Sequence, residues 1–235
     1  MHELTIALLL LAAGAYAAGL RRLWARAGMG RGIAFSKAAL FYSGCAVAGV
    51  AVLGLHELAE ERLWAHMIQH ELLMVVAAPM IVLGRPIETW IWALPADSRR
   101  AARLPRALSD PALAWVLHAA AIWVWHLPVL FEAALADPWL HLAQHASFFG
   151  TALLFWWSLL APSHRSFAGM ASLFTTMLHT GALGALMALA RGSWYAGFSL
   201  EDQQLAGLVM WVPAGLAYPL AALFLGSQWL RRSAA

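Results

Sequence analysis

Hydrophobic residues occur along this chain in seven long stretches separated by shorter polar segments. Each stretch has about the 17–25 residues that a helix needs to cross a bilayer. The stretches are continuously apolar and lack the alternation expected of membrane β-strands. We therefore predict an all-α, polytopic bundle of transmembrane helices that forms a single domain over residues 1–235. The seven predicted spans are 3–20, 36–56, 66–84, 111–127, 139–161, 168–190 and 204–229.

Composition supports a membrane location for the chain. Its 235 residues are 62% hydrophobic and 11% charged, whereas soluble domains have about 45–50% and 25%. Thirteen tryptophans and a single lysine fit this view, because indole rings favour the membrane–water interface. The first span follows Met-His-Glu and has no basic segment before it. We therefore expect a retained helix and not a cleaved signal peptide.

Positive charge is distributed unequally over the segments that connect the predicted spans. Placing successive segments on alternating sides puts 13 of the 15 lysines and arginines on one side, in 21–37, 85–110, Arg165 and the C-terminal tail. Only Arg62 and Arg191 fall on the other side. The positive-inside rule then places the N-terminus outside and the C-terminus in the cytoplasm. Topology thus explains the basic pI of 9.5 without a nucleic-acid partner.

Six of the ten histidines fall near the outer ends of the predicted spans. They are His56, His66, His70, His126, His141 and His145. The arrangement occurs twice, since a histidine that ends one span precedes an H-x-x-Q-H motif, HMIQH or HLAQH, that opens the next. Histidines four residues apart share one helix face, about 6 Å apart along the axis. We predict that these faces converge and that some of the six bind a metal or haem.

The residues around the motifs narrow the choice of ligand. Zinc proteases need a glutamate as general base in HExxH, but Met67 and Leu142 occupy that position here. Imidazole suits copper, zinc, iron and nickel, and thioether sulfur adds a preference for Cu(I). Met67 and Met74 therefore favour copper, although such methionines usually serve packing. A single cysteine, Cys45, excludes a disulfide framework and a CxxC motif.

Polar residues outside the two motifs have open interpretations. Asp202, in EDQQLAG before the last span, would be a metal ligand or would orient a ligand ring. It would equally cap its own helix together with Glu201. His118 and His179 lie near mid-span, where ionisable residues are costly and mark either hydrogen bonds between helices or a relay.

Four segments in this order resemble the CtaG-type cytochrome c oxidase assembly factors. They are HMIQHELLMVVAAPMIVLGRP, WHLP, HLAQHASFFGTALLFWW and EDQQLAGLVMWVP. The resemblance covers most of the chain from residue 50 onward. It implies a multi-pass protein of the bacterial inner membrane that helps to mature a haem-copper oxidase by handling copper on the periplasmic side. A non-enzymatic role is expected.

The resemblance also implies a ligand set and partners. His66, His70, His141 and His145 would bind copper, as Cu(I) or Cu(II), with His56, His126 and Asp202 as companions. Residues expected to support the site or to relay protons are His179, Met67, Met74, Gln69 and Gln144. The implied partners are a cytochrome c oxidase subunit or another copper chaperone, the lipid bilayer and, in a homo-oligomer, a second copy; nucleic acid is not among them.

Three other functions fit parts of the pattern. Paired histidines on neighbouring helices would also hold a b-type haem in an electron carrier. A metal or proton transporter is the next alternative, but His118 and His179 would make a thin relay within the spans. A retinal protein is disfavoured, because the only lysine, Lys37, lies in the second span and the seventh has none for a Schiff base.

Overall fold

The computed structural model describes residues 2–99, 110–160 and 167–233, and these residues contain helices and no strands. The helices are α1 (His2–Ala27), α2 (Phe35–Gly49), η1 (Val50–Gly54), α3 (His56–Glu61), α4 (Leu63–Glu71), η2 (Leu72–Ala77), α5 (Ala78–Leu83), α6 (Pro86–Ala93), α7 (Ala96–Arg99), α8 (Pro111–Trp125), α9 (Pro128–Ala136), α10 (Pro138–Leu160), α11 (Phe167–Ala188) and α12 (Leu200–Ser233). The all-α prediction is confirmed over this part of the chain. Arg165 and several arginines of the predicted loop 85–110 lie outside the described residues.

Within the described ranges, five helical segments are long and apolar enough to cross a membrane. They are Glu3–Ala27, Phe35–Gly54, Leu63–Leu83, Ala168–Ala188 and Leu200–Arg231. Helices α8 and α9 would add a sixth as one broken span, bent by 76°. The break lies at Pro128, because proline has no N–H to continue a helix and is favoured at a helix start. The 23-residue α10 covers the fifth predicted stretch, and the total of seven spans stays a prediction.

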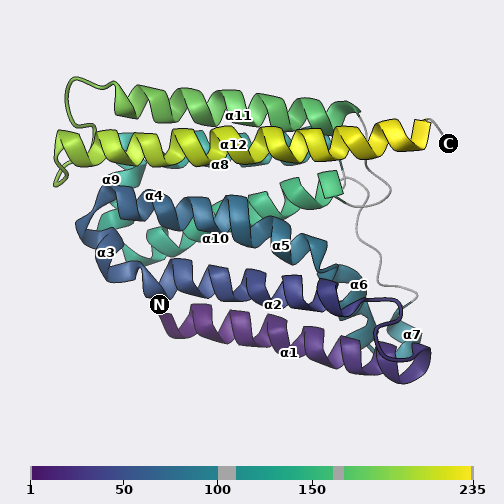
Figure 1. Cartoon of the computed structure of the whole chain (residues 1–235). Coiled ribbons are helices and arrows are strands. Elements are labelled where there is room, and N and C mark those ends of the chain that lie inside the picture. Colours follow the sequence, from purple (N-terminus) through teal and green to yellow (C-terminus); the bar gives the residue numbers. More distant parts are fainter. Residues whose placement is uncertain (1, 100–109, 161–166, 234–235) are drawn as a thin grey trace.

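The long helices run side by side in three groups (Figure 1). Helices α8, α11 and α12 form one side, α4, α5 and α10 the middle, and α1 and α2 the opposite side. Helices α11 and α12 have the most extensive contact among the described helices, and a Cβ atom on Gly207 would lie 2.5 Å from the carbonyl oxygen of Gly184. Only glycine permits this approach, and small residues at such crossings let membrane helices pack backbone to backbone.

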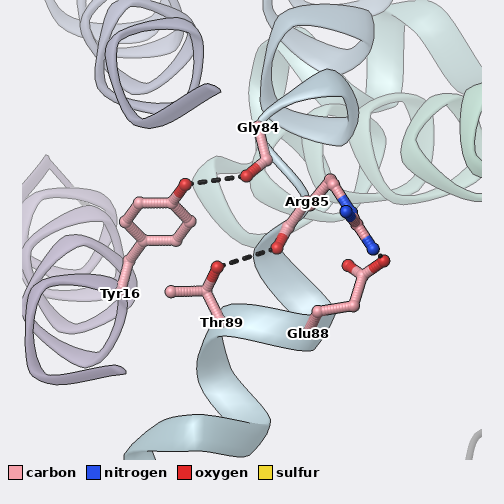
Figure 2. Close-up of polar contacts among 5 residues, drawn as sticks. All are labelled: Tyr16, Gly84, Arg85, Glu88 and Thr89. Atoms are coloured by element: carbon pink, nitrogen blue, oxygen red, sulfur yellow. Dashed lines mark hydrogen bonds and ion pairs between the residues drawn. The ribbon is translucent and has the colours of Figure 1, made fainter. Parts of the chain in front are cut away.

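A polar joint fixes α1 to the turn between α5 and α6 (Figure 2). The Tyr16 hydroxyl donates to the Gly84 carbonyl at 2.7 Å, and the Thr89 hydroxyl donates to the Arg85 carbonyl at 3.0 Å. Arg85 has a left-handed φ of 57°, and the following Pro86 disfavours the right-handed helical conformation for this residue. The joint lies at the end of the bundle opposite α3 and α9 (Figure 1).

Two segments of π-helix interrupt the second and third spans. The widened turns of η2 come just before Pro79, whose ring clashes with the carbonyl four residues earlier and removes one backbone donor. The indole Nε1–H of Trp156 in α10 donates to the carbonyl of Met74, which lies in η2, at 2.8 Å. Such segments often lie at functional sites, and here η2 follows directly after the helix that contains His66 and His70.

Candidate metal centre

All six histidines that the sequence places at helix ends come together at the end of the bundle where α3 and α9 lie. We call this the histidine end. Each ring lies close to at least one other, with centroid separations of 4.4 Å for His141–His145, 4.5 Å for His66–His70, 5.3 Å for His66–His141 and for His70–His145, 6.1 Å for His70–His126 and 6.3 Å for His56–His141. The predicted convergence of the two H-x-x-Q-H faces is therefore present, since α4 and α10 contribute interleaved rings.

Three of these rings form a buried core, which we call the triad: His66, His70 and His145. One ligand nitrogen from each can be chosen so that all three lie within 4.8 Å of one another. The residues are only 1%, 1% and 7% exposed. Distances of this size suit a single ion at about 2.0–2.1 Å from each imidazole nitrogen after small side-chain adjustments.

The triad nitrogens have few protein partners. The Nε2 atoms of His66 and His145 are buried without one, and both ring nitrogens of His70 are in the same condition. Leaving such a group unpaired costs roughly 1–3 kcal/mol, and buried polar atoms are otherwise almost always hydrogen-bonded. Several orphaned imidazoles in one place therefore fit a bound metal ion, because imidazole nitrogen is a ligand that copper, zinc, iron and nickel share.

His126 lies beside the triad with a defined orientation. Its Nδ1 lies 2.6 Å from the Ile122 carbonyl oxygen, so Nδ1 must carry the proton and donate. The lone pair is then on Nε2, a buried atom without a protein partner. The Tyr195 hydroxyl donates to the His126 carbonyl at 2.9 Å. Burial raises the pKa of Tyr195, which keeps this hydroxyl protonated and able to donate.

His56 and His141 form the more accessible part of the cluster, and both are half-buried. His56 Nε2 lies 3.2 Å from the Glu60 carboxylate. Both histidines line a cavity of about 450 Å³, and His145 of the triad lines it as well. The cluster thus has a solvent-accessible side at His56 and a buried side at His70.

Aromatic rings enclose the buried side of the triad. Phe148 lies 4.5 Å from His70 and Phe131 lies 5.1 Å from His66, measured between ring centroids. The predicted supporting residues Met67 and Met74 are buried within the same hydrophobic core. Apolar walls of this kind exclude water and control access to a metal site.

The two glutamines of the motifs are buried at the same level as the histidines. The Gln69 amide Nε2–H donates to the Ala51 carbonyl of η1 at 2.8 Å, which ties the helix of His66 and His70 to the second span. Gln144 is completely buried, and neither its amide oxygen nor its nitrogen has a protein partner. Gln69 therefore positions α4, and Gln144 adds hydrogen-bonding capacity beside the rings.

Asp202 lies at the start of α4 and not among the histidine rings. Its carboxylate accepts the backbone N–H of Leu63 at 2.9 Å and that of Trp64 at 3.3 Å. These are two of the N–H groups that the first turn of a helix leaves unpaired. The aspartate thus caps a neighbouring helix, whereas the sequence indicated a ligand, a partner of a ligand ring or a cap of α12 itself. Ser199 takes the last role by accepting the Asp202 N–H at 3.1 Å.

The two mid-span histidines have partners away from this cluster. His118 Nδ1 lies 3.1 Å from the Thr151 hydroxyl. The Trp123 indole N–H donates to His179 Nδ1 at 3.3 Å. The structure therefore gives His179 an interhelical hydrogen bond, while its predicted support of the metal site stays a prediction.

Sequence reasoning missed two residues of this region. Glu71 directly follows His70, is 8% exposed, and has a buried carboxylate oxygen without a protein partner. An acid before the apolar run LLMVVAAP carries a signal, because ionisable groups within a span are costly. Tyr195 gave no signal, since it lies in a connecting segment far along the chain from His126.

The fold and the histidine end define a polytopic helical membrane protein with a buried imidazole cluster. The family model for the cytochrome c oxidase caa3 assembly factor (Caa3_CtaG) matches residues 14–232. The chain belongs to this family, so the resemblance found in the sequence is confirmed. The family description gives a role in the assembly of cytochrome c oxidase. Comparisons with curated proteins and with solved structures give no match.

Proposed function

We propose that this protein is a non-enzymatic copper chaperone of oxidase assembly. His66, His70 and His145 would bind copper as cargo, with His126 as a fourth donor, and deliver it to an oxidase subunit or another chaperone. The single observation that carries the proposal is the triad, three buried histidines whose ligand nitrogens lie within 4.8 Å of one another. Buried nitrogens without protein partners on each of the three rings support it.

The donor set supports copper over other cargo. Cys45 and the carboxylates of the described residues are not part of the triad, which leaves neutral nitrogen donors. Among divalent first-row metals, copper binds such donors most tightly. Protonated imidazole cannot bind a metal, so copper should be held at neutral pH and released in acid.

The packing of the rings argues against the haem alternative. A bis-imidazole haem needs two histidines on opposite faces of a flat macrocycle. The triad rings instead lie 4.5–5.9 Å apart between centroids, and Phe131 and Phe148 pack against them. A porphyrin would have to separate these contacts, whereas a single ion would not.

The membrane orientation is part of the proposal. The two termini lie at opposite ends of the bundle (Figure 1), and the first helix begins at the histidine end. With 13 of the 15 lysines and arginines assigned to the opposite side, the positive-inside rule places the histidine end outside the cytoplasm. We propose seven spans in a bacterial inner membrane, with the cluster at the periplasmic face.

Copper analysis of the purified protein tests the proposed function. The metal-free protein in detergent is incubated with Cu(I) under a reductant or with Cu(II), desalted, and analysed for copper per chain by mass spectrometry. We expect wild-type protein to retain copper and the double variant His70→Ala/His145→Ala to lose it. The triad supplies three nitrogens, and the variant would leave only one.

A matched control separates loss of ligands from loss of fold. His118→Gln removes a buried histidine outside the cluster while an amide can still meet Thr151, so its copper content should equal that of wild type. Size-exclusion profiles and thermal midpoints monitor folding, and His70→Gln/His145→Gln provides a second, polar version of the double variant. Wild-type protein without copper, or folded double variants that retain it, would overturn the proposal.

A further inference from the structure

We infer that His56 and His141 form an exchange station through which copper enters and leaves the buried triad. This inference rests on the proposed function and adds a path and a mechanism of transfer to it. It assigns different roles to the six histidines: the triad stores the ion, and the outer pair passes it between the triad and the aqueous side.

The cavity beside the cluster provides the path. It has a volume of about 450 Å³, and its polar lining is Glu3, Thr5, His56, Glu60, His141 and His145. His145 belongs both to this lining and to the triad. A metal ion that reaches the cavity floor therefore meets a ligand of the buried site directly.

The rings form a continuous series from the cavity to the triad. His56 lies 6.3 Å from His141, and His141 lies 5.3 Å from His66 and 4.4 Å from His145, between centroids. His141 Nε2 is buried and has no protein partner. An ion can pass along this series by ligand exchange, in which one copper–nitrogen bond forms for each that breaks. Neutral imidazoles donate lone pairs throughout, so the oxidation state of copper does not change.

Negative charge at the cavity favours cations. The exposed carboxylates of Glu3 and Glu60 both line it, and charges lining a cleft raise the local concentration of opposite ions. The Glu60 carboxylate, 3.2 Å from His56 Nε2, also orients that ring, as carboxylates commonly do for ligand histidines.

The second cavity that reaches His145 does not offer a comparable route. Its volume is about 310 Å³, and almost all of its lining is apolar, including Leu73, Phe149 and Leu153. An ion would lose its hydration there and would meet only Cys45 and His145 as possible ligands, which is costly. On the far side of the triad, Phe131 and Phe148 cover the rings.

Rates of copper transfer test this inference. Copper-loaded protein is mixed with a high-affinity chelator and its release is followed by stopped-flow absorbance, and loading is followed from a weak copper complex. At equilibrium, the double variant His56→Ala/His141→Ala should still bind the copper that the triad holds in the wild-type protein. Both loading and release should slow by about tenfold or more, an effect typical of removing groups that support a metal site.

Controls make each outcome decisive. Glu61→Gln changes an exposed carboxylate of α3 that does not line the cavity, and its rates should equal those of wild type. His56→Gln/His141→Gln repeats the test with polar side chains of similar size. Unchanged rates in the folded variants, or loss of the triad copper at equilibrium, would overturn the exchange station. Wild-type protein that binds no copper would instead overturn the proposed function.

Discussion

His70 shows at the scale of one residue how a binding site conflicts with stability. Both of its ring nitrogens are buried without a protein partner, and the residue is 1% exposed. Such a side chain destabilises the metal-free protein, since each unpaired group forfeits its hydration. The position of His70 at a helix end could be predicted from the sequence, but its lack of partners depends on what α8 and α10 place around it.

The first prediction concerns the substitution His70→Leu. Because it replaces two unpaired polar atoms with apolar ones, the metal-free variant should be as stable as wild type or more stable, by about 1–3 kcal/mol. Thermal unfolding in detergent without copper measures this. The same variant should bind less copper, and added copper should raise its melting temperature less than that of wild type. A strongly destabilised metal-free variant would instead indicate that His70 is a packing residue.

At the scale of the element, α4 is positioned by contacts with other segments of the chain. Asp202 of α12 caps its first turn, Gln69 joins it to η1, and Pro79 follows the π-helical segment at its other end. These contacts orient the helix face that contains His66 and His70.

We predict that Asp202→Ala will weaken the copper site without removing any of its ligands. Loss of a helix cap typically costs about 1 kcal/mol, so the variant should unfold at a lower temperature. Its copper affinity, measured by competition with a chelator, should fall while copper per chain at saturation stays unchanged. Glu201→Gln alters the exposed neighbouring acid and serves as the matched control. Loss of copper at saturation would instead identify Asp202 as a ligand.

The elements differ in how far the sequence could predict them. Alternating helix directions place the ends that contain His66 and His141 on one side, so their approach follows from hydropathy and spacing alone. The partner of Asp202 could not be predicted, because the contact with Leu63 joins residues far apart in the chain. The bend between α8 and α9 was also missed, although WHLP contains the proline that causes it.

At the scale of the whole molecule, function depends on which way the bundle lies in the membrane. The histidine end and the C-terminus of α12 lie at opposite ends of the bundle (Figure 1). The arginine-rich segments are predicted on the side of the C-terminus, as the positive-inside rule requires of a cytoplasmic face.

Reporter fusions check this orientation. We predict that alkaline phosphatase inserted at Gly192, between α11 and α12, will be active, because that enzyme folds only outside the cytoplasm. Green fluorescent protein at the C-terminus should fluoresce, as it does when it remains in the cytoplasm. Inactive phosphatase at Gly192, or a dark C-terminal fusion of an expressed protein, would contradict the proposed topology.

The position of the chain's single cysteine bears on the direction in which a bound copper ion would be transferred. Cys45 lines the apolar cavity behind His145 and is not part of the triad. Thiolates bind Cu(I) more strongly than imidazoles do. A Cu(I) ion held by nitrogen alone would therefore transfer favourably to an acceptor that presents cysteine thiolates.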